Sequence, residues 1–191
     1  MNMLTDSHDA VTADWAAALL DFWFNCVGEA GWWSHDPALD RQCATRFGHL
    51  WAEKRTLPSV DFLERADDAL AAVLLFDQLP RNMFRHSARA FATDELARDV
   101  ARGAIAQGYD IQIGGAGRLF FYMPFQHSEN LDDQTLSLTL FEGAGDAQSL
   151  DFARQHHATI MHFGRFPHRN ALLGRPTLPE EQEAARQGAS W

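Results

Sequence analysis

The sequence has very little cysteine, and both cysteines are expected to be free thiols. Cys26 and Cys43 cannot form a disulfide framework, and each falls on an apolar face of an expected helix, so we expect buried, reduced side chains. The sequence also lacks a basic start followed by an apolar run, so it shows no secretory signal. Its longest strongly apolar run, 69–76, is too short to span a bilayer. These absences predict a soluble, cytoplasmic protein outside the membrane.

Positive charge is scarce, and nearly all of it is arginine. Acidic residues outnumber basic ones by 26 to 16, which gives a formal net charge of −10. Such a surface repels nucleic acid unless its basic residues cluster, so no nucleic-acid partner is expected. A single lysine, Lys54, stands against fifteen arginines. That bias suits bidentate contacts with carboxylates or phosphates, although a skewed genome composition produces the same bias.

Familiar catalytic and metal-binding motifs are also missing. The glycine-rich stretch 113–117 is not GxGxxG and lacks the lysine of a P-loop, so we predict a loop there. GxSxG is absent, and neither cysteine has a basic neighbourhood, so nucleophilic catalysis has little support. His156, His157, His162 and His168 lie close together without HExxH or CxxC spacing. His157 falls on an apolar stripe, which favours a core histidine, so neither metal nor cofactor is predicted.

Helical periodicity is what the sequence does contain. Apolar residues recur at three- and four-residue intervals in 15–26, 39–51, 62–74, 96–104 and 150–164. A length of 191 residues with 46% hydrophobic residues fits one well-packed core. Seven or eight helices joined by short connections therefore predict an all-α single domain whose neighbouring helices pack antiparallel.

Helix boundaries can be predicted from end signals. The expected caps are Thr12, Asp36, Ser59, Thr93 and Thr177, the last paired with Glu180 in a capping box. Pro80 is expected to stop the helix that Ser59 begins, and Gly108 lies near the end of the one that Thr93 begins. The run 118–125 is apolar on every side, which indicates an enclosed central helix. The stretch 135–141 alternates like a strand but has no partner strand, so we predict a helix.

Three stretches combine a proline at a helix boundary with polar residues: FDQLPRN at 76–82, YMPFQHSENLDDQ at 122–134 and HFGRFPHRNALLGR at 162–175. Helix ends carry unpaired backbone groups and often meet at clefts, so these stretches are sensible places for a site.

The carboxylate of Asp77 is predicted to be buried. Leu70, Val73 and Asp77 are spaced i, i+3, i+7, so Asp77 projects from a core face and must reach a cation or become neutral. Its candidate partners are Arg81, Arg118, Arg165 and Arg169. A structural ion pair at a helix end and a catalytic carboxylate are both consistent with this pattern.

His127 and Glu129 could form an acid–base pair. In a turn both can point into one pocket, where His127 shuttles a proton and Glu129 orients it or acts as the base. The alternative is a helix start, with Ser128 or Asn130 as the cap and the aspartates at 132 and 133 in its first turn. That alternative explains the aspartates but leaves His127 and Glu129 unexplained.

The third stretch gathers Arg165, His168, Arg169 and Asn170 in a turn before a short helix. Arginines and an amide placed so can bind a phosphate or a carboxylate. They could equally pair internally with acidic residues such as Asp77, Glu129 or Asp132, and the sequence does not separate these alternatives.

The three stretches also resemble the DUF924 family of bacterial proteins. The resemblance is carried by LDFWF at 20–24, LLFDQLPRNMFR at 74–85, RAFATD at 89–94, FFYMPFQHSE at 120–129 and FGRFPHRNALLGR at 163–175. It implies an all-helical, tetratricopeptide-like fold and a helix at 135–141. We expect a single domain over 1–191 with flexible ends at 1–11 and 188–191. It implies no reaction. The matching polar and proline positions are Asp77, Gln78, Pro80, Arg81, Asn82, His127, Ser128, Glu129, Gln134, Arg165, Pro167, His168, Arg169 and Asn170.

Two functional hypotheses follow, with a purely structural one beside them. The first is a pocket that binds a small anionic or polar ligand, formed by Asp77, Arg81, Asn82, His127, Glu129, Arg165, His168, Arg169 and Asn170, with His127 and Glu129 as the pair that would carry any acid–base chemistry. The second is a protein- or peptide-binding module that uses Trp32, Trp33 and Trp191 as anchors. In the third, the polar clusters only support helix ends.

Overall fold

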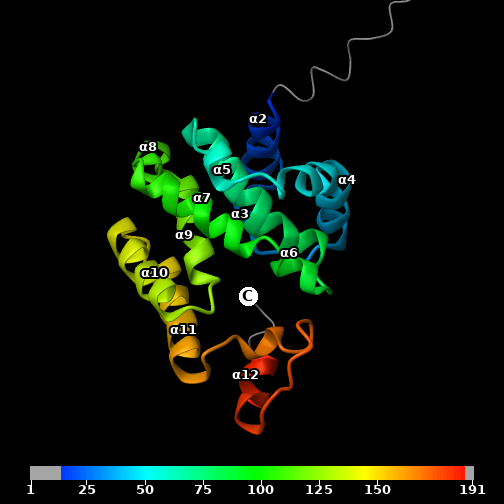
Figure 1. Ribbon diagram of the computed structural model, residues 1–191, viewed down its shortest axis with the longest axis vertical. Coiled ribbons are helices and arrows are strands. Elements are labelled where there is room, and N and C mark those ends of the chain that lie inside the picture. The colour runs from blue at the N-terminus through cyan, green and yellow to red at the C-terminus, as the bar shows by residue number, and fades with distance from the viewer. Residues whose placement is uncertain (1–13, 188–191) are drawn as a thin grey trace, which may run out of the picture.

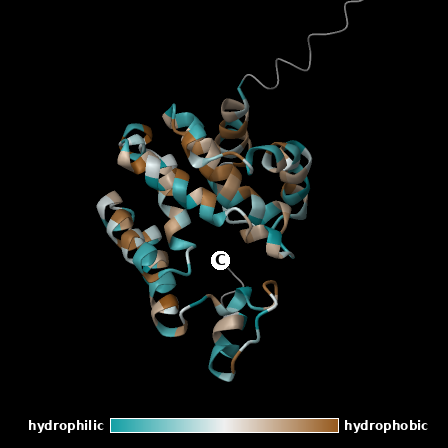
Figure 2. Ribbon diagram, in the orientation of Figure 1, coloured by the Kyte–Doolittle hydropathy of each residue, from teal (hydrophilic) through white to brown (hydrophobic). Residues whose placement is uncertain are grey.

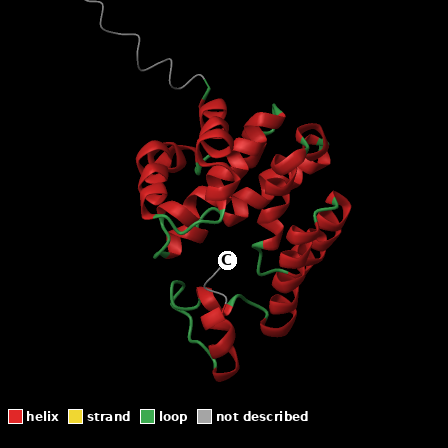
Figure 3. Cartoon of the chain, turned by 180° about the vertical axis from the view of Figure 1, so that it is seen from behind, coloured by secondary structure: helices red, strands yellow, loops and turns green. Residues whose placement is uncertain are grey.

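The computed structural model describes residues 14–187, and every regular element in that range is a helix (Figures 1 and 3). The predicted all-α class and single domain are confirmed, while the tetratricopeptide-like detail stays a prediction. The expected flexible ends at 1–11 and 188–191, the cap at Thr12 and the anchor Trp191 lie outside the described residues. The first described helix is capped by Asp14, whose carboxylate accepts the Ala17 N–H at 3.0 Å.

The first half of the chain contains α2 (Trp15–Leu20), a π-helical turn (Asp21–Val27), α3 (Gly28–Trp32), α4 (Pro37–Lys54), a 3₁₀ turn (Ser59–Phe62), α5 (Ala66–Val73), a second π-helical turn (Leu74–Gln78) and α6 (Leu79–Met83). The second half contains a 3₁₀ turn (Ala88–Phe91), α7 (Asp94–Ala106), α8 (Tyr109–Ile113), α9 (Gly115–Gln126), α10 (Leu131–Ala144), α11 (Ala147–Phe163), two 3₁₀ turns (Pro167–Arg169 and Pro179–Glu181) and α12 (Gln182–Gln187).

The core lies around α5 and α9. Helix α5 packs against α2, α7 and α9, and α9 packs against α7 and α10. Phe120, Phe121 and Phe125 on α9 are almost fully buried, which confirms the enclosed helix predicted at 118–125. Hydrophobic positions colour much of the α5 ribbon (Figure 2). Burying one such aromatic side chain contributes about 1.5–3 kcal/mol to the stability of the fold. This packing holds α9 in place, and with it the turn that follows α9.

Pro80 does not stop its helix, and that prediction was wrong. The chain stays helical from Ala66 to Met83 because the turn at Leu74–Gln78 is π-helical and Pro80 lies in the first turn of α6, which begins at Leu79. A proline removes the N–H that would bond to the carbonyl four residues earlier, here that of Phe76. The Thr93 hydroxyl donates to that carbonyl at 2.7 Å. A side chain distant in sequence thus satisfies the carbonyl that Pro80 leaves open.

Three other predicted boundaries need correction. Ser59 begins only a 3₁₀ turn, and α5 starts after Arg65, whose extended backbone separates the two. The stretch 113–117 is not a loop, because α9 begins at Gly115 and only Gly114 breaks the helix. Gly114 has φ of 64°, a conformation that favours glycine, and it separates α8 from α9. The C-terminal capping interaction is shifted by one residue: the Glu181 carboxylate accepts the Leu178 N–H at 2.8 Å.

Other boundary predictions are confirmed. Asp36 precedes α4 and accepts the Ala38 N–H at 2.7 Å. Thr93 precedes α7 as predicted, but its side chain makes no capping hydrogen bond. The alternating stretch 135–141 lies inside α10, with Ser137 and Phe141 buried. The strand-like alternation is therefore accidental in a segment whose tertiary packing is helical.

Two burial predictions were wrong. Cys43 is buried but Cys26 is exposed, because the π-helical turn Asp21–Val27 rotates later residues away from the face that regular helical spacing predicts. On α11 the buried face carries His156 rather than His157, and Met161 is 65% exposed. Both cysteines are free.

Between residues 14 and 187 no helix is both long and apolar enough to cross a membrane.

Candidate functional site

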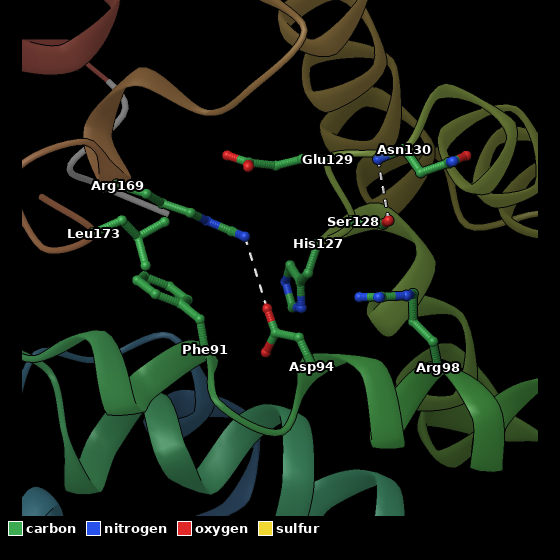
Figure 4. Close-up of a pocket in the computed structure, with 9 residues that line it drawn as sticks. All are labelled: Phe91, Asp94, Arg98, His127, Ser128, Glu129, Asn130, Arg169 and Leu173. Atoms are coloured by element: carbon green, nitrogen blue, oxygen red, sulfur yellow. Dashed lines mark hydrogen bonds and ion pairs between the residues drawn. The ribbon is translucent and has the colours of Figure 1, made fainter. Parts of the chain in front are cut away.

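A pocket of about 380 Å³ opens where the start of α7, the turn after α9 and the C-terminal segment 164–187 meet (Figure 4). Figure 1 shows that segment, orange to red, facing the ends of α6 and α9. The residues that line the pocket are Phe91, Asp94, Arg98, His127, Ser128, Glu129, Asn130, Arg169 and Leu173. Three of the predicted site residues, His127, Glu129 and Arg169, therefore come together from the second and third stretches.

Asp77 and His127 form a buried pair. The Asp77 side chain is fully buried in the π-helical turn before α6, and His127 Nδ1 lies 2.8 and 2.9 Å from its two carboxylate oxygens. Gln78 also donates to the Asp77 carboxylate at 2.6 Å. Burial disfavours the charge, but Arg81, His127 and the hydrogen bonds outweigh it and hold the pKa of Asp77 well below its usual range. Asp77 is therefore an ionised acceptor.

This pairing determines the protonation of the His127 ring. Because the Asp77 carboxylate only accepts, Nδ1 must carry the proton. Burial lowers the pKa of His127, Asp77 opposes that shift, and the charge of Arg81 adds to it. The ring is consequently neutral near pH 7, with Nε2 unprotonated. Among residues 14–187 nothing donates a hydrogen bond to Nε2, and the ring lines the pocket.

Asp94 lines the pocket, and Arg81 pairs with it without lining the pocket itself. Arg81 donates to both oxygens of Asp94, at 3.1 and 3.2 Å, and also to the backbone carbonyl of Asp77. Its charge also lies 3.3 Å from the Asp77 carboxylate. Arg81 therefore joins the start of α7 to the turn before α6, and the predicted partnership of Asp77 with Arg81 is what the structure shows.

Arg169 enters the pocket from the opposite wall. Its guanidinium lies between the rings of Phe91 and Phe166, 4.7 and 4.5 Å from their centroids, and one terminal nitrogen is 3.7 Å from Asp94. The residue is only 7% exposed, and Nε is buried without a hydrogen-bond partner. Burial and the nearby Arg81 lower the pKa of Arg169 to about 10, so it stays charged at neutral pH.

Glu129 does not pair with His127, which corrects the predicted dyad. Arg175 donates to both Glu129 oxygens, at 2.7 and 2.9 Å, and the Phe166 N–H donates to one of them at 2.7 Å. Glu129 therefore attaches the C-terminal segment to the turn after α9. Asp77, 50 residues from His127, takes the place beside the imidazole.

Two other predicted site residues, Arg165 and Asn170, belong to a separate network around Glu181. Arg165 donates to Glu181 at 2.6 and 2.9 Å, and Asn170 donates to it at 3.1 Å. The Asn170 side-chain oxygen accepts from Arg175 at 3.0 Å. Neither Arg165 nor Asn170 lines the pocket. Their partners hold the C-terminal segment in its fold.

Asn82 and His168 also lie outside the lining of the pocket. Asn82 donates to Asp40 at 2.9 Å and shares that carboxylate with Arg85, which ties α6 to α4. His168 packs its ring against Phe166, and burial followed by the charge of Arg169 lowers its pKa to about 4. These two residues support the walls without facing the hollow.

Sequence reasoning missed several contributors. Asp94 looks like an ordinary acidic residue in the first turn of a helix, and Arg98 follows it by one turn. Phe91 and Leu173 are apolar residues in connecting segments, where no periodicity marks them. The available signal was the RAFATD motif, which ends at Asp94.

The helix start predicted at 128–133 is confirmed, since Asn130 accepts the N–H groups of the residues at 132 and 133.

Within the described residues, the fold does not bring a set of metal-binding side chains together. Over residues 14–187, no three side chains of histidine, cysteine, aspartate or glutamate gather so that they could hold a metal ion. The chemistry available at the pocket is instead that of an imidazole base, a buried guanidinium and paired carboxylates.

Residues 19–189 match the family described as "Bacterial protein of unknown function (DUF924)". The chain belongs to this family. It is also similar to a solved structure of a protein of unknown function from Agrobacterium tumefaciens, with 40% sequence identity and a TM-score of 0.84, over 93% of this chain and 99% of the other. A search of curated proteins found no match.

Proposed function

We propose that this member of the DUF924 family binds a small anionic or polar ligand in the pocket between His127 and Arg169. The observation that carries the proposal is the state of Arg169, a buried cation whose side chain donates no hydrogen bond to any residue between 14 and 187. A buried charged donor without an acceptor costs several kcal/mol unless something occupies that place. A ligand acceptor would supply the missing partner.

The neighbouring imidazole supports acid–base chemistry on that ligand. His127 Nε2 is the basic edge of a ring that Asp77 holds through Nδ1, the arrangement that orients a general base. In the proposed reaction Nε2 takes a proton from the ligand or from a water molecule beside it, and the Arg169 guanidinium stabilises the negative charge that develops. Asp77 acts as a positioning residue, because it contacts the ring and not the ligand.

A thermal-shift screen of small carboxylates, phosphates and neutral polar compounds tests the proposal. Compounds that raise the melting temperature of the wild type should lose that effect in Arg169→Met and in His127→Gln. Arg154→Met is the matched control, since Arg154 is exposed on α11 and pairs with Asp151 outside the pocket. Ligands that stabilise Arg169→Met as well as the wild type, or a wild type that responds to no compound, would contradict the proposal.

The second candidate function is a tetratricopeptide-like protein- or peptide-binding module. Its supporting observation is Trp33, which is 62% exposed at the end of α3. Trp32 is a weaker anchor, because its indole donates to the Trp23 carbonyl at 2.9 Å and packs on Phe120. A pulldown that depends on Trp33 and tolerates Arg169→Met would favour this module over the pocket.

A further inference from the structure

The charge balance and donor geometry of the pocket allow its ligand class to be narrowed, on the premise that the proposed pocket function holds. The guanidinium of Arg169 is fixed between two aromatic rings, so only the edge of its plane can meet a ligand. An edge of two parallel N–H groups matches the two oxygens of a carboxylate. Stacking between Phe91 and Phe166 also removes the side-chain freedom that binding would otherwise cost.

The charges around the pocket leave room for one negative charge. The ionisable residues that line it, together with every residue linked to them through a chain of ion pairs, comprise five arginines and four carboxylates; Arg102 belongs to this network only through Asp133. The members are Arg81, Arg98, Arg102, Arg169 and Arg175, with Asp77, Asp94, Glu129 and Asp133. His127 is neutral. The set therefore carries a net charge of +1, which a monoanion neutralises and a phosphate dianion reverses.

The carboxylates already in the wall also disfavour a dianion. Asp94 lines the pocket 3.7 Å from Arg169, so a second negative charge on the ligand would face it. Arg98 offers little compensation, because its Nε lies 3.4 Å from Asp133, which Arg102 also contacts at 2.7 Å. Among the residues that line the pocket, Arg169 is thus the cation with the least complete pairing.

The second recognition element is His127 Nε2, which can only accept. A ligand whose carboxylate lies on Arg169 therefore gains a further hydrogen bond if it carries a donor that reaches this nitrogen. A hydroxyl satisfies the acceptor without adding charge, whereas an ammonium group would restore the net charge of +1 that the carboxylate removes. The pocket volume of about 380 Å³ lies at the small end of ligand sites.

We infer that the pocket takes a small hydroxycarboxylic acid, with its carboxylate on Arg169 and its hydroxyl donating to His127 Nε2. Two observations support this. The Arg169 guanidinium has only a 3.7 Å ion pair with Asp94 and donates no hydrogen bond within residues 14–187, and the imidazole nitrogen Nε2 of His127 has no donor there; both residues line one pocket (Figure 4).

The test is a titration of ¹⁵N-histidine-labelled protein at pH 7.5, followed through the ring nitrogens of His127. The probes are lactate and 3-hydroxybutyrate, propionate without the hydroxyl, lactamide without the charge, and inorganic phosphate. We expect one of the hydroxycarboxylates to move the Nε2 signal saturably, propionate to bind roughly five- to tenfold more weakly for loss of one hydrogen bond, and lactamide and phosphate to have no effect. Arg169→Met should abolish the lactate or hydroxybutyrate response, and Arg154→Met should preserve it.

The outcomes separate this inference from the proposal on which it rests. If phosphate saturates the His127 signal in an Arg169-dependent way and the hydroxycarboxylates do not, the ligand class is wrong but the pocket function stands. If propionate binds as tightly as the hydroxycarboxylates, the role given to Nε2 is wrong. If none of the probes moves the His127 signal at all, this inference falls, and the thermal-shift screen decides the fate of the pocket itself.

Discussion

Two buried polar networks each include a residue of the same C-terminal turn, Asn170 in one and Arg169 in the other, and they differ in how completely their groups are paired. Around Glu181, the carboxylate accepts from Arg165, Asn170 and a backbone N–H, and Asn170 is bonded at both ends of its amide. Around Asp77 and Asp94, the carboxylates are paired, but His127 Nε2 and the Arg169 guanidinium have no hydrogen-bond partner among residues 14–187.

The completeness of pairing distinguishes a network that stabilises the fold from a network that could bind a ligand. A saturated network has no group left for a ligand and contributes through the stability of the fold. An unsaturated network buries polar groups without hydrogen-bond partners, and the free-energy cost of that burial is not explained by the fold alone. Adjacent residues in one turn, Arg169 and Asn170, belong to opposite types, so substitutions at these two positions should have opposite effects.

Breaking the saturated network should cost the most. Asn170→Ala removes two buried hydrogen bonds, so Arg175 loses an acceptor and Glu181 loses a donor. This should lower the free energy of unfolding by about 2–4 kcal/mol. At this chain length that corresponds to a fall in melting temperature of roughly 5–15 °C. Calorimetry of Asn170→Ala beside Asn25→Ala, an exposed amide bonded to Asp21, measures the difference. Equal melting temperatures for the two variants would remove the structural role given to Asn170.

Acid should lower the stability of the fold through two buried histidines near the two networks, His156 and His168. Burial lowers the pKa of His156 to about 3 and that of His168 to about 4, whereas the unfolded chain binds these protons near pH 6.5. Because the unfolded state binds more protons, stability is fully present above pH 6.5 and is lost as the pH falls toward 4. Each histidine contributes at most about 1.4 kcal/mol per pH unit, and relaxation should leave a total loss on the order of 2 kcal/mol.

Urea unfolding between pH 7.5 and 4.5 checks this dependence. His156→Gln should flatten the slope, whatever its effect on stability at pH 7.5, and His157→Gln on the half-buried neighbouring position should leave the slope unchanged. A wild type whose stability is constant across this range would contradict the burial of His156 and His168.

Removing Arg169, the buried cation that donates no hydrogen bond within residues 14–187, should have the smallest effect on stability. Arg169→Met keeps most of the packing against Phe91 and Phe166 and leaves Asp94 paired with Arg81. The free energy of unfolding should therefore stay within about 1 kcal/mol of the wild type or rise, as happens when a buried charge without a full set of partners is replaced by an apolar side chain. Urea denaturation at pH 7.5 measures it. A loss as large as that of Asn170→Ala would place Arg169 among the structural residues.

The fold class was predictable from the sequence because helical periodicity reflects which face of each helix is buried. Errors arose where a distant side chain or a π-helical turn decides the outcome. Pro80 looks like a helix stop until Thr93 is seen bonding the carbonyl that the proline leaves free. Cys26 looks buried until the extra residue in its π-helical turn rotates it to the surface.

The site was predictable only in part, for a similar reason. The spacing of Asp77 predicts its burial, and the motifs mark His127 and Arg169 as polar residues at chain turns. The partnerships do not follow from spacing, since 50 residues separate Asp77 from His127 and 46 separate Glu129 from Arg175. Local proximity suggested Glu129 as the partner of His127, but the neighbouring C-terminal segment supplies Arg175, which forms a two-bonded pair with that carboxylate.

The most direct test of the account is the protonation of His127 in the protein without added ligand. In a ¹⁵N spectrum of histidine-labelled protein at pH 7, assigned with His127→Gln, Nδ1 should be protonated and Nε2 should have the shift of an unprotonated nitrogen. Asp77→Asn should reverse or mix these states, because its amide no longer requires a donor at Nδ1. A doubly protonated ring at pH 7, or a wild-type ring with its proton on Nε2, would contradict the claim that the pocket presents an open base.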